Sequence, residues 1–222
     1  MMLVSARRRA QGWMAKQDWA HTRGRIQHFG GRILAMTLLL GLPAVAMADE
    51  ERGNSAVVVA SSDGECYAKS VPEGLFGDAG QTTVYEVETG TDRPLATFNW
   101  YAREIYLACG VYLNGRNRYL VVRMGPWARG YRAAADDLAL EIYSDGALLA
   151  RYSTLDIAGT PDNVSHSVSH YRVFAQVSGL GWSTTNDAYG FHATTIDDRE
   201  LYFSPSDGAM QVLGSSAEGT RR

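Results

Sequence analysis

The sequence predicts an all-β protein, a single antiparallel β-sandwich or β-meander domain with short hairpins that follows a cleaved signal peptide. Branched and aromatic residues gather in short runs, and glycine-containing turns separate these runs. Side chains alternate with a period of two in the clearest of them, as on a pleated sheet. We expect the domain to span residues 49–212, after a signal peptide at 1–48 and before a disordered tail at 213–222.

The first 48 residues have the order of a secretory signal. Basic residues precede an apolar run at 33–42, and the stretch closes on the small residues Ala46 and Ala48 before an acidic segment. The alternative is an uncleaved anchor. The apolar stretch contains Pro43, however, and is shorter than the roughly 20 residues that a bilayer requires. We therefore expect a periplasmic or secreted protein with no membrane span in the mature chain.

The charge of the mature part argues against nucleic acid as a partner. The whole chain carries a net charge of −3, but residues 1–48 hold seven basic residues and one acidic residue. The chain from residue 49 therefore holds 14 Lys and Arg against 23 Asp and Glu, a net charge of −9. Such a domain has no basic surface for phosphates or anionic lipids.

The two cysteines, Cys66 and Cys109, both lie in the mature part. Export would take them to an oxidising compartment, where disulfides form. A reactive thiol pair is the alternative, but the Cys-x-x-Cys spacing typical of such pairs is absent. We expect a structural disulfide between them.

The strands are expected in chain order as short runs of branched and aromatic residues. Leu138, Leu140 and Ile142 then alternate with their neighbours, and Asp145-Gly146 supplies a turn that returns the chain through Tyr152 as a hairpin. A helix that begins near residue 133 is the alternative for this segment. The preceding predicted strands are 56–60, 65–70, 82–88, 95–100, 104–111 and 118–124.

A sequence pattern that recurs weakly along the chain indicates repeated hairpins. Asp92, Asp145 and Asp198 each stand in a turn before a predicted strand with an aromatic residue downstream. Propeller blades and β-meanders both show such spacing. Because a four-stranded blade needs about 40 residues, a length that the spacing of these three turns does not match, a sandwich or meander is favoured.

Three segments carry a resemblance to a known group of proteins. They are Gly-Pro-Trp-Ala-Arg-Gly at 125–130, Tyr-Ser-Thr-Leu-Asp-Ile-Ala-Gly at 152–159, and the stretch 165–171. They resemble an uncharacterised family of exported bacterial β-rich proteins, over about residues 66–203 of this chain. The family has no assigned activity, so the resemblance implies one exported domain and no catalytic residue.

His166 and His170 form the one close histidine pair after the leader. The surrounding residues alternate as in a strand, which would place the two rings roughly 13 Å apart on one face, too far for one metal ion. We predict no metal and no cofactor. An alternative is a small exported hydrolase that uses His166 or His170 with Asp162, although the Gly-x-Ser-x-Gly motif of many serine hydrolases is missing.

The segment 125–132 has the most unusual composition in the chain. Trp127, Arg129 and Arg132 stand among proline and glycine, and aromatic and arginine side chains often anchor interfaces or bind carboxylates and sugars. The alternative is that Trp127 closes the end of the core while the arginines offset the acidic charge. The stretch 154–163 is expected as a loop at the same rim.

We therefore predict an exported binding or interaction module. Its rim residues Trp127, Arg129 and Arg132 would contact an envelope protein or an anionic envelope glycan, with His166 and His170 as weaker candidates. The hydrolase is the alternative, and a structural surface component is a third hypothesis. The sequence does not set the oligomeric state.

Overall fold

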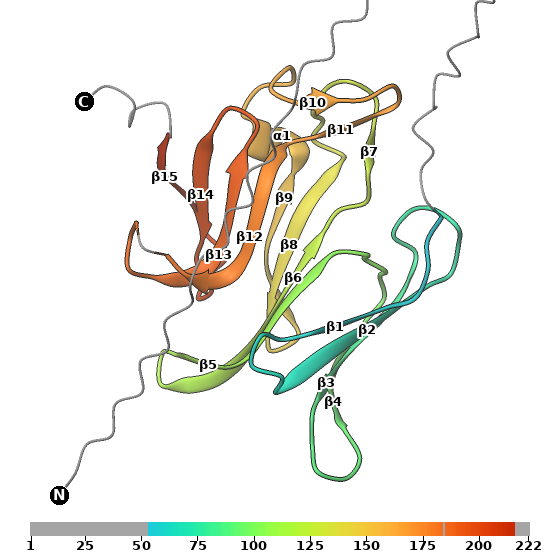
Figure 1. Ribbon diagram of the computed structural model, residues 1–222, viewed down its shortest axis with the longest axis vertical. Coiled ribbons are helices and arrows are strands. Elements are labelled where there is room, and N and C mark those ends of the chain that lie inside the picture. Colours follow the sequence, from blue (N-terminus) through green and yellow to red (C-terminus); the bar gives the residue numbers. More distant parts are fainter. Residues whose placement is uncertain (1–52, 184, 216–222) are drawn as a thin grey trace, which may run out of the picture. The chain divides into compact units, whose positions relative to one another are not determined.

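The computed structural model describes residues 53–183 and 185–215, and nearly all of the regular structure in these ranges is β (Figure 1). The predicted signal peptide at 1–48 lies outside the described residues. The described residues form four antiparallel sheets, which we name A to D in the order in which the chain first enters them. The all-β prediction is confirmed.

The three large sheets each have four strands, joined mostly to their neighbours in the chain. Sheet A contains β1 (Val57–Ala60), β2 (Cys66–Pro72), β3 (Gly80–Glu86) and β4 (Arg93–Phe98). Sheet B contains β5 (Ile105–Leu113), β6 (Arg116–Met124), β8 (Leu138–Ser144) and β9 (Ala147–Ser153). Sheet D contains β12 (Phe174–Trp182), β13 (Tyr189–Thr195), β14 (Arg199–Phe203) and β15 (Met210–Ser215).

The small sheet C joins segments that are far apart in the sequence. Its order is β10-β11-β7, with β10 (Ser165–His166), β11 (His170–Arg172) and β7 (Ala128–Arg129). The short helix α1 (Thr154–Ala158) follows β9 directly. It begins with a capping box in which Ser153 and Asp156 each bind the other's backbone amide, so the stretch predicted as a loop at 154–163 opens with a helix.

Sheet B lies between sheets A and D, as Figure 1 shows. One core cluster joins one face of sheet B to sheet D, sheet C and α1. A second cluster joins the other face of sheet B to sheet A. Because both faces of sheet B are covered, the adjacent residues Val121 and Val122 are both fully buried, and each contributes to a different cluster.

A disulfide crosses between the first two sheets. Cys66 in β2 is bonded to Cys109 in β5, with their Cα atoms 6.1 Å apart. Cys66 is fully buried in the cluster between sheets A and B. The predicted pairing is confirmed.

The predicted hairpin at 138–152 is also confirmed. β8 and β9 pair in antiparallel fashion, and the turn residues Asp145 and Gly146 have φ of 51° and 82°. These positive values suit Asp-Gly in a two-residue hairpin loop. The alternative helix is not formed in this segment. The turns at Asp92, Asp145 and Asp198 precede β4, β9 and β14, which lie in three different sheets.

Two expectations about the later chain are corrected. The histidine segment is not a single strand, because the chain reverses within 167–169 and Ser167 donates its backbone amide to the carbonyl of His170 at 2.8 Å. The predicted domain end at 212 falls inside β15, whose backbone pairs with β14 as far as Ser215. The rest of the predicted tail, 216–222, lies outside the described residues. Among the described helices, none has the length and apolar character required to cross a bilayer.

Candidate functional site

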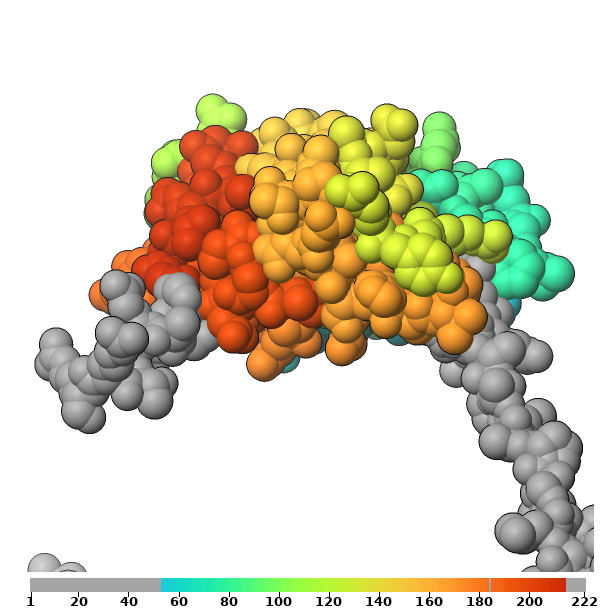
Figure 2. Space-filling model, turned by 90° about the horizontal axis from the view of Figure 1, so that it is seen from above, coloured from blue at the N-terminus to red at the C-terminus, as the bar shows by residue number. Residues whose placement is uncertain are grey.

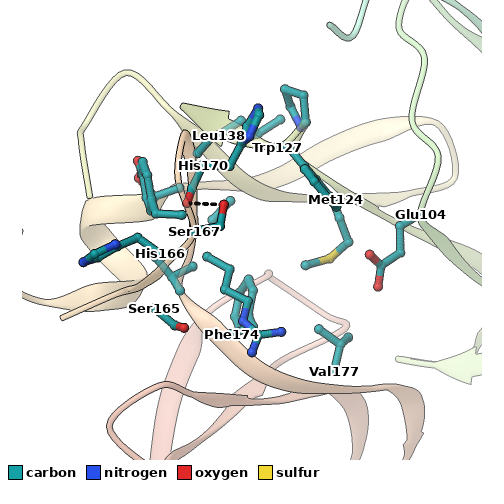
Figure 3. A pocket seen from close by; sticks show the side chains of 18 residues that line it. Glu104, Met124, Trp127, Leu138, Ser165, His166, Ser167, His170, Phe174 and Val177 are labelled. Carbon is teal, nitrogen blue, oxygen red and sulfur yellow. Dashed lines mark hydrogen bonds between the residues drawn. The ribbon is translucent and has the colours of Figure 1, made fainter. Parts of the chain in front are cut away.

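A cavity with a volume of about 500 Å³ lies where sheets B, C and D meet (Figure 3). Its wall comes from the end of β6, from β8, from the β10–β11 hairpin and from the start of β12. Figure 3 shows Met124 on one side of the space and Phe174 and Val177, both of β12, on the other, with Glu104 at one end.

The chain enters this wall through Gly125. A Cβ atom at this position would lie 1.8 Å from the carbonyl oxygen of Leu138, so a larger residue cannot occupy it without displacing the backbone. The amide of Gly125 donates to the carbonyl of Ala139 at 2.9 Å. This close approach carries the chain past the first residues of β8 and places Pro126 and Trp127 at the cavity.

Sheet C holds the segment 125–132 against the histidine hairpin. The backbone of Arg129 pairs with that of His170 in the antiparallel register of β7 and β11. Beyond β7, the Gly130 amide donates to the carbonyl of Ser169 at 2.9 Å. Figure 2 shows the yellow-green segment around β7 packed beside the orange segment that contains β10 and β11. The segments at 125–130 and 165–171, far apart in the sequence, therefore form one wall.

Each histidine of the predicted pair contacts an aromatic ring of the facing segment. The ring of His170 lies 5.4 Å from that of Trp127, and the ring of His166 lies 5.3 Å from that of Tyr131, both edge to face. The hydroxyl of Tyr131 also donates to the carbonyl of Val168 at 2.5 Å. The two rings therefore have different partners and belong to different strands.

A chain of hydrogen bonds fixes the side of the cavity next to α1. The hydroxyl of Tyr171 donates to Asp137 at 2.5 Å and lies 2.7 Å from the hydroxyl of Thr154. Burial and the hydrogen bond to Asp137 raise the pKa of Tyr171 to about 12, so this phenol is neutral at physiological pH. Thr154 in turn binds the backbone amide and carbonyl of Ala134. The wall is thus held in place without a ligand.

A second cavity, of about 310 Å³, adjoins the first. The two share Glu104, Met124 and the segment 125–127. The second cavity is completed by Asn54, Gly77 and residues 101–103, which belong to sheet A and its connections. Trp127 therefore borders both cavities, and this residue is 57% exposed.

The structure brings together part of the predicted site. Trp127, His166 and His170 line the first cavity, whereas Arg129 and Arg132 stand outside its wall. Arg132 forms an exposed ion pair with Asp162, with Nε and Oδ1 3.0 Å apart. This pair places the stretch 154–163 beside the rim, as expected. The alternative in which Trp127 closes the core is wrong, because its ring is mostly exposed.

Sequence reasoning missed the residues on the flanks of the predicted segments. Met124 and Arg172 each adjoin a segment that was singled out, and Phe174 and Val177 lie at the start of β12. Glu104 precedes β5 and accepts a hydrogen bond from Tyr106. No motif marks these residues, since ordinary strand residues supply the wall.

The polar groups of the hairpin have a limited chemical repertoire. The hydroxyl of Ser169 lies 2.8 Å from Nδ1 of His170, a distance that permits proton transfer. Within residues 53–183 and 185–215, no group of three or more His, Cys, Asp or Glu side chains is arranged to hold a metal ion.

No protein-family model, no curated protein and no solved structure matches this chain.

Proposed function

We propose that this protein is an exported binding module that holds a small, largely apolar ligand in the cavity beside Trp127. The observation that carries the proposal is the exposed indole of Trp127 at a 500 Å³ cavity whose other walls include Met124, Phe174 and Val177. Small-molecule sites fall in the range of about 300–1,000 Å³ and are mostly apolar with a few polar groups.

Pre-organisation of the wall supports this proposal. The cavity is bounded by paired backbone in sheet C and by the Tyr171 hydrogen bonds, so a ligand would not have to order these segments. Binding sites that already exist before the ligand arrives lose less conformational entropy on binding.

The export part of the proposal rests on the leader and the cysteines. The order of residues in 1–48 is that of a secretory signal, and the Cys66–Cys109 disulfide suits an oxidising compartment. The predicted contact of Trp127, Arg129 and Arg132 with an envelope protein or glycan stays a prediction. Capture of partners from envelope extract by the wild type and by W127A/R129A tests it.

Fluorescence titration with N-phenyl-1-naphthylamine, a neutral apolar dye, tests the cavity as a binding site. We expect saturable binding to the wild type and a loss of at least about tenfold in affinity for Val177→Trp, which fills the cavity. Val212→Trp is the matched control, because Val212 is an exposed valine on β15 outside the cavity. Equal affinities for all three proteins, each folded by circular dichroism, would contradict the proposal.

A second candidate function is the small exported hydrolase, favoured by the contact between Ser169 and His170. Asp162, the acid predicted for it, is 79% exposed and forms an ion pair with Arg132. Labelling by a fluorophosphonate probe that disappears in Ser169→Ala would support a serine hydrolase. An unlabelled wild type would contradict it.

A further inference from the structure

One cation on the cavity wall, Arg172, has no ionic partner among the residues that the structure describes. Arg172 is the last residue of β11, where its backbone pairs with Ser165 of β10 and its side chain is exposed. Its guanidinium forms no ion pair with any other residue that the structure describes. The nearby rim arginine Arg132 is paired with Asp162 and stands outside the cavity.

The surface next to this cation is apolar. Met124, Leu138, Phe174 and Val177 contribute to the same cavity, and Met124 and Leu138 belong to strands of sheet B. A guanidinium beside an apolar wall suits a ligand with an anionic group and an apolar body. Arginine is well adapted to such a role because its planar N–H donors match carboxylate and sulfonate oxygens.

One carboxylate limits the charge that such a ligand can carry. Glu104 lies on the wall shared by the two cavities and accepts a hydrogen bond from Tyr106. A ligand with a second negative group would bring that group near Glu104, and repulsion between like charges would disfavour it. The net negative charge of the domain acts in the same direction.

We infer that the ligand of this cavity is an amphipathic monoanion, whose negative group binds Arg172 and whose apolar body packs against Met124 and Phe174. This inference rests on the proposed function and names the ligand class of the same site. It assigns Arg172 as the residue that selects anions and Glu104 as the residue that rejects dianions.

Two dyes with the same ring system test the role of Arg172 in the full chain. 8-Anilinonaphthalene-1-sulfonate carries one sulfonate, and N-phenyl-1-naphthylamine is its neutral counterpart. We expect Arg172→Gln to weaken the sulfonate dye about tenfold, the effect of losing a hydrogen bond to a charged group. The affinity for the neutral dye should change less than about twofold, and this retained binding also shows that the variant is folded.

Arg116→Gln is the matched control for that change of charge. Arg116 begins β6, is exposed and contributes to neither cavity. Its substitution should therefore leave the affinities for both dyes within about twofold of the wild-type values. If Arg172→Gln leaves the sulfonate dye unchanged while the neutral dye still binds, the inferred ligand class is wrong and the binding site stands. If neither dye binds the wild type, the proposed function is wrong.

Competition between decanoate and decanedioate tests the role of Glu104. Both have ten carbons, and we expect decanoate to displace the neutral dye at least about tenfold more effectively than the dicarboxylate. Glu104→Gln should reduce this difference in displacement, because decanedioate should bind more tightly to the variant while the affinity for decanoate stays the same. Equal competition by the two acids in the wild type, or no change of their ratio in Glu104→Gln, would overturn the monoanion assignment.

Discussion

Arg123 and Glu141 form an ion pair that is buried between sheets A and B, with Nε and Oε2 2.6 Å apart. Their side chains are 7% and 4% exposed. The guanidinium also lies over the ring of Trp100, 4.8 Å from its centroid. Burial raises the pKa of Glu141, but hydrogen bonds from Arg123 and Tyr143 outweigh this effect, so its pKa lies below the usual value.

Removal of one member of this pair should destabilise the fold strongly. Glu141→Gln leaves the buried Arg123 with only the half-exposed Asp78, 3.4 Å away, as an ionic partner. We expect the free energy of unfolding to fall by about 3 kcal/mol or more. Arg123→Met with Glu141→Leu should cost less than the sum of the single changes, because neither buried charge is left alone.

Urea denaturation measures these differences. Arg93→Gln is the control, since Arg93 at the start of β4 forms exposed ion pairs with Glu86 and Glu88, and their loss should cost less than about 1 kcal/mol. Additive effects of Arg123→Met and Glu141→Leu would contradict the assignment of a coupled pair.

Reduction of the disulfide should destabilise the protein without removing a single heavy atom from the core. The Cys66–Cys109 bond closes a separation of 43 residues. By lowering the entropy of the unfolded chain, such a bond stabilises the folded protein by about 4 kcal/mol. We expect the urea midpoint to fall when a phosphine reductant is added. A midpoint that is identical with and without the reductant, after thiol titration has shown two free sulfurs, would refute this prediction.

Gly179 permits the contact between sheets B and D. It has a φ of +86°, and a Cβ atom there would lie 2.9 Å from the ring of Tyr106. Gly179→Ala should lower the free energy of unfolding by about 2 kcal/mol through backbone strain and overpacking. Gly181→Ala on the same strand is the control, because its Cβ would meet no atom within 4 Å. Similar thermal midpoints for the two variants would show that the contact is unimportant.

His192 should make the stability depend on mildly acidic pH. Burial lowers its pKa below the ordinary value of 6.5, although the Gly181 backbone and Glu200 oppose this. Below pH 6.5 the histidine takes up a proton in the unfolded chain more readily than in the folded protein. The contribution of His192 to the free energy of unfolding is therefore complete above that pH, and it is lost as the pH falls towards the pKa of the folded state. Urea denaturation at about pH 7.5 and about pH 5.5 should show that the free energy of unfolding falls less between these two pH values for His192→Asn than for the wild type. An identical pH dependence would exclude this role.

Local chemistry made most of the strands predictable. The Asp145-Gly146 turn and the period of two in 138–143 are properties of neighbouring residues, and both predict the β8–β9 hairpin. The β10–β11 hairpin was missed because its strands are only two and three residues long. In the turn between them, Ser167-Val168-Ser169, serine is the only turn-forming residue type, and serine marks a reversal more weakly than glycine, proline, asparagine or aspartate does.

The arrangement of the sheets was beyond prediction for a different reason. Period-two alternation tells which residues share a face of β8, but not that the face with Glu141 and Tyr143 is covered by sheet A. The site shows the same limit. The composition of 125–132 indicated Trp127, whereas Phe174 and Arg172 become part of the site only through the pairing of β11 with β7.

The most direct test of the ligand cavity is a methyl NMR titration of the protein labelled at methionine. The chain after residue 48 contains two methionines, Met124 on the cavity wall and Met210 at the start of β15, and Met124→Leu and Met210→Leu assign their signals. Addition of N-phenyl-1-naphthylamine should shift the Met124 methyl signal progressively and leave that of Met210 in place. A Met124 signal that does not move while the dye is bound would contradict a ligand site in this cavity.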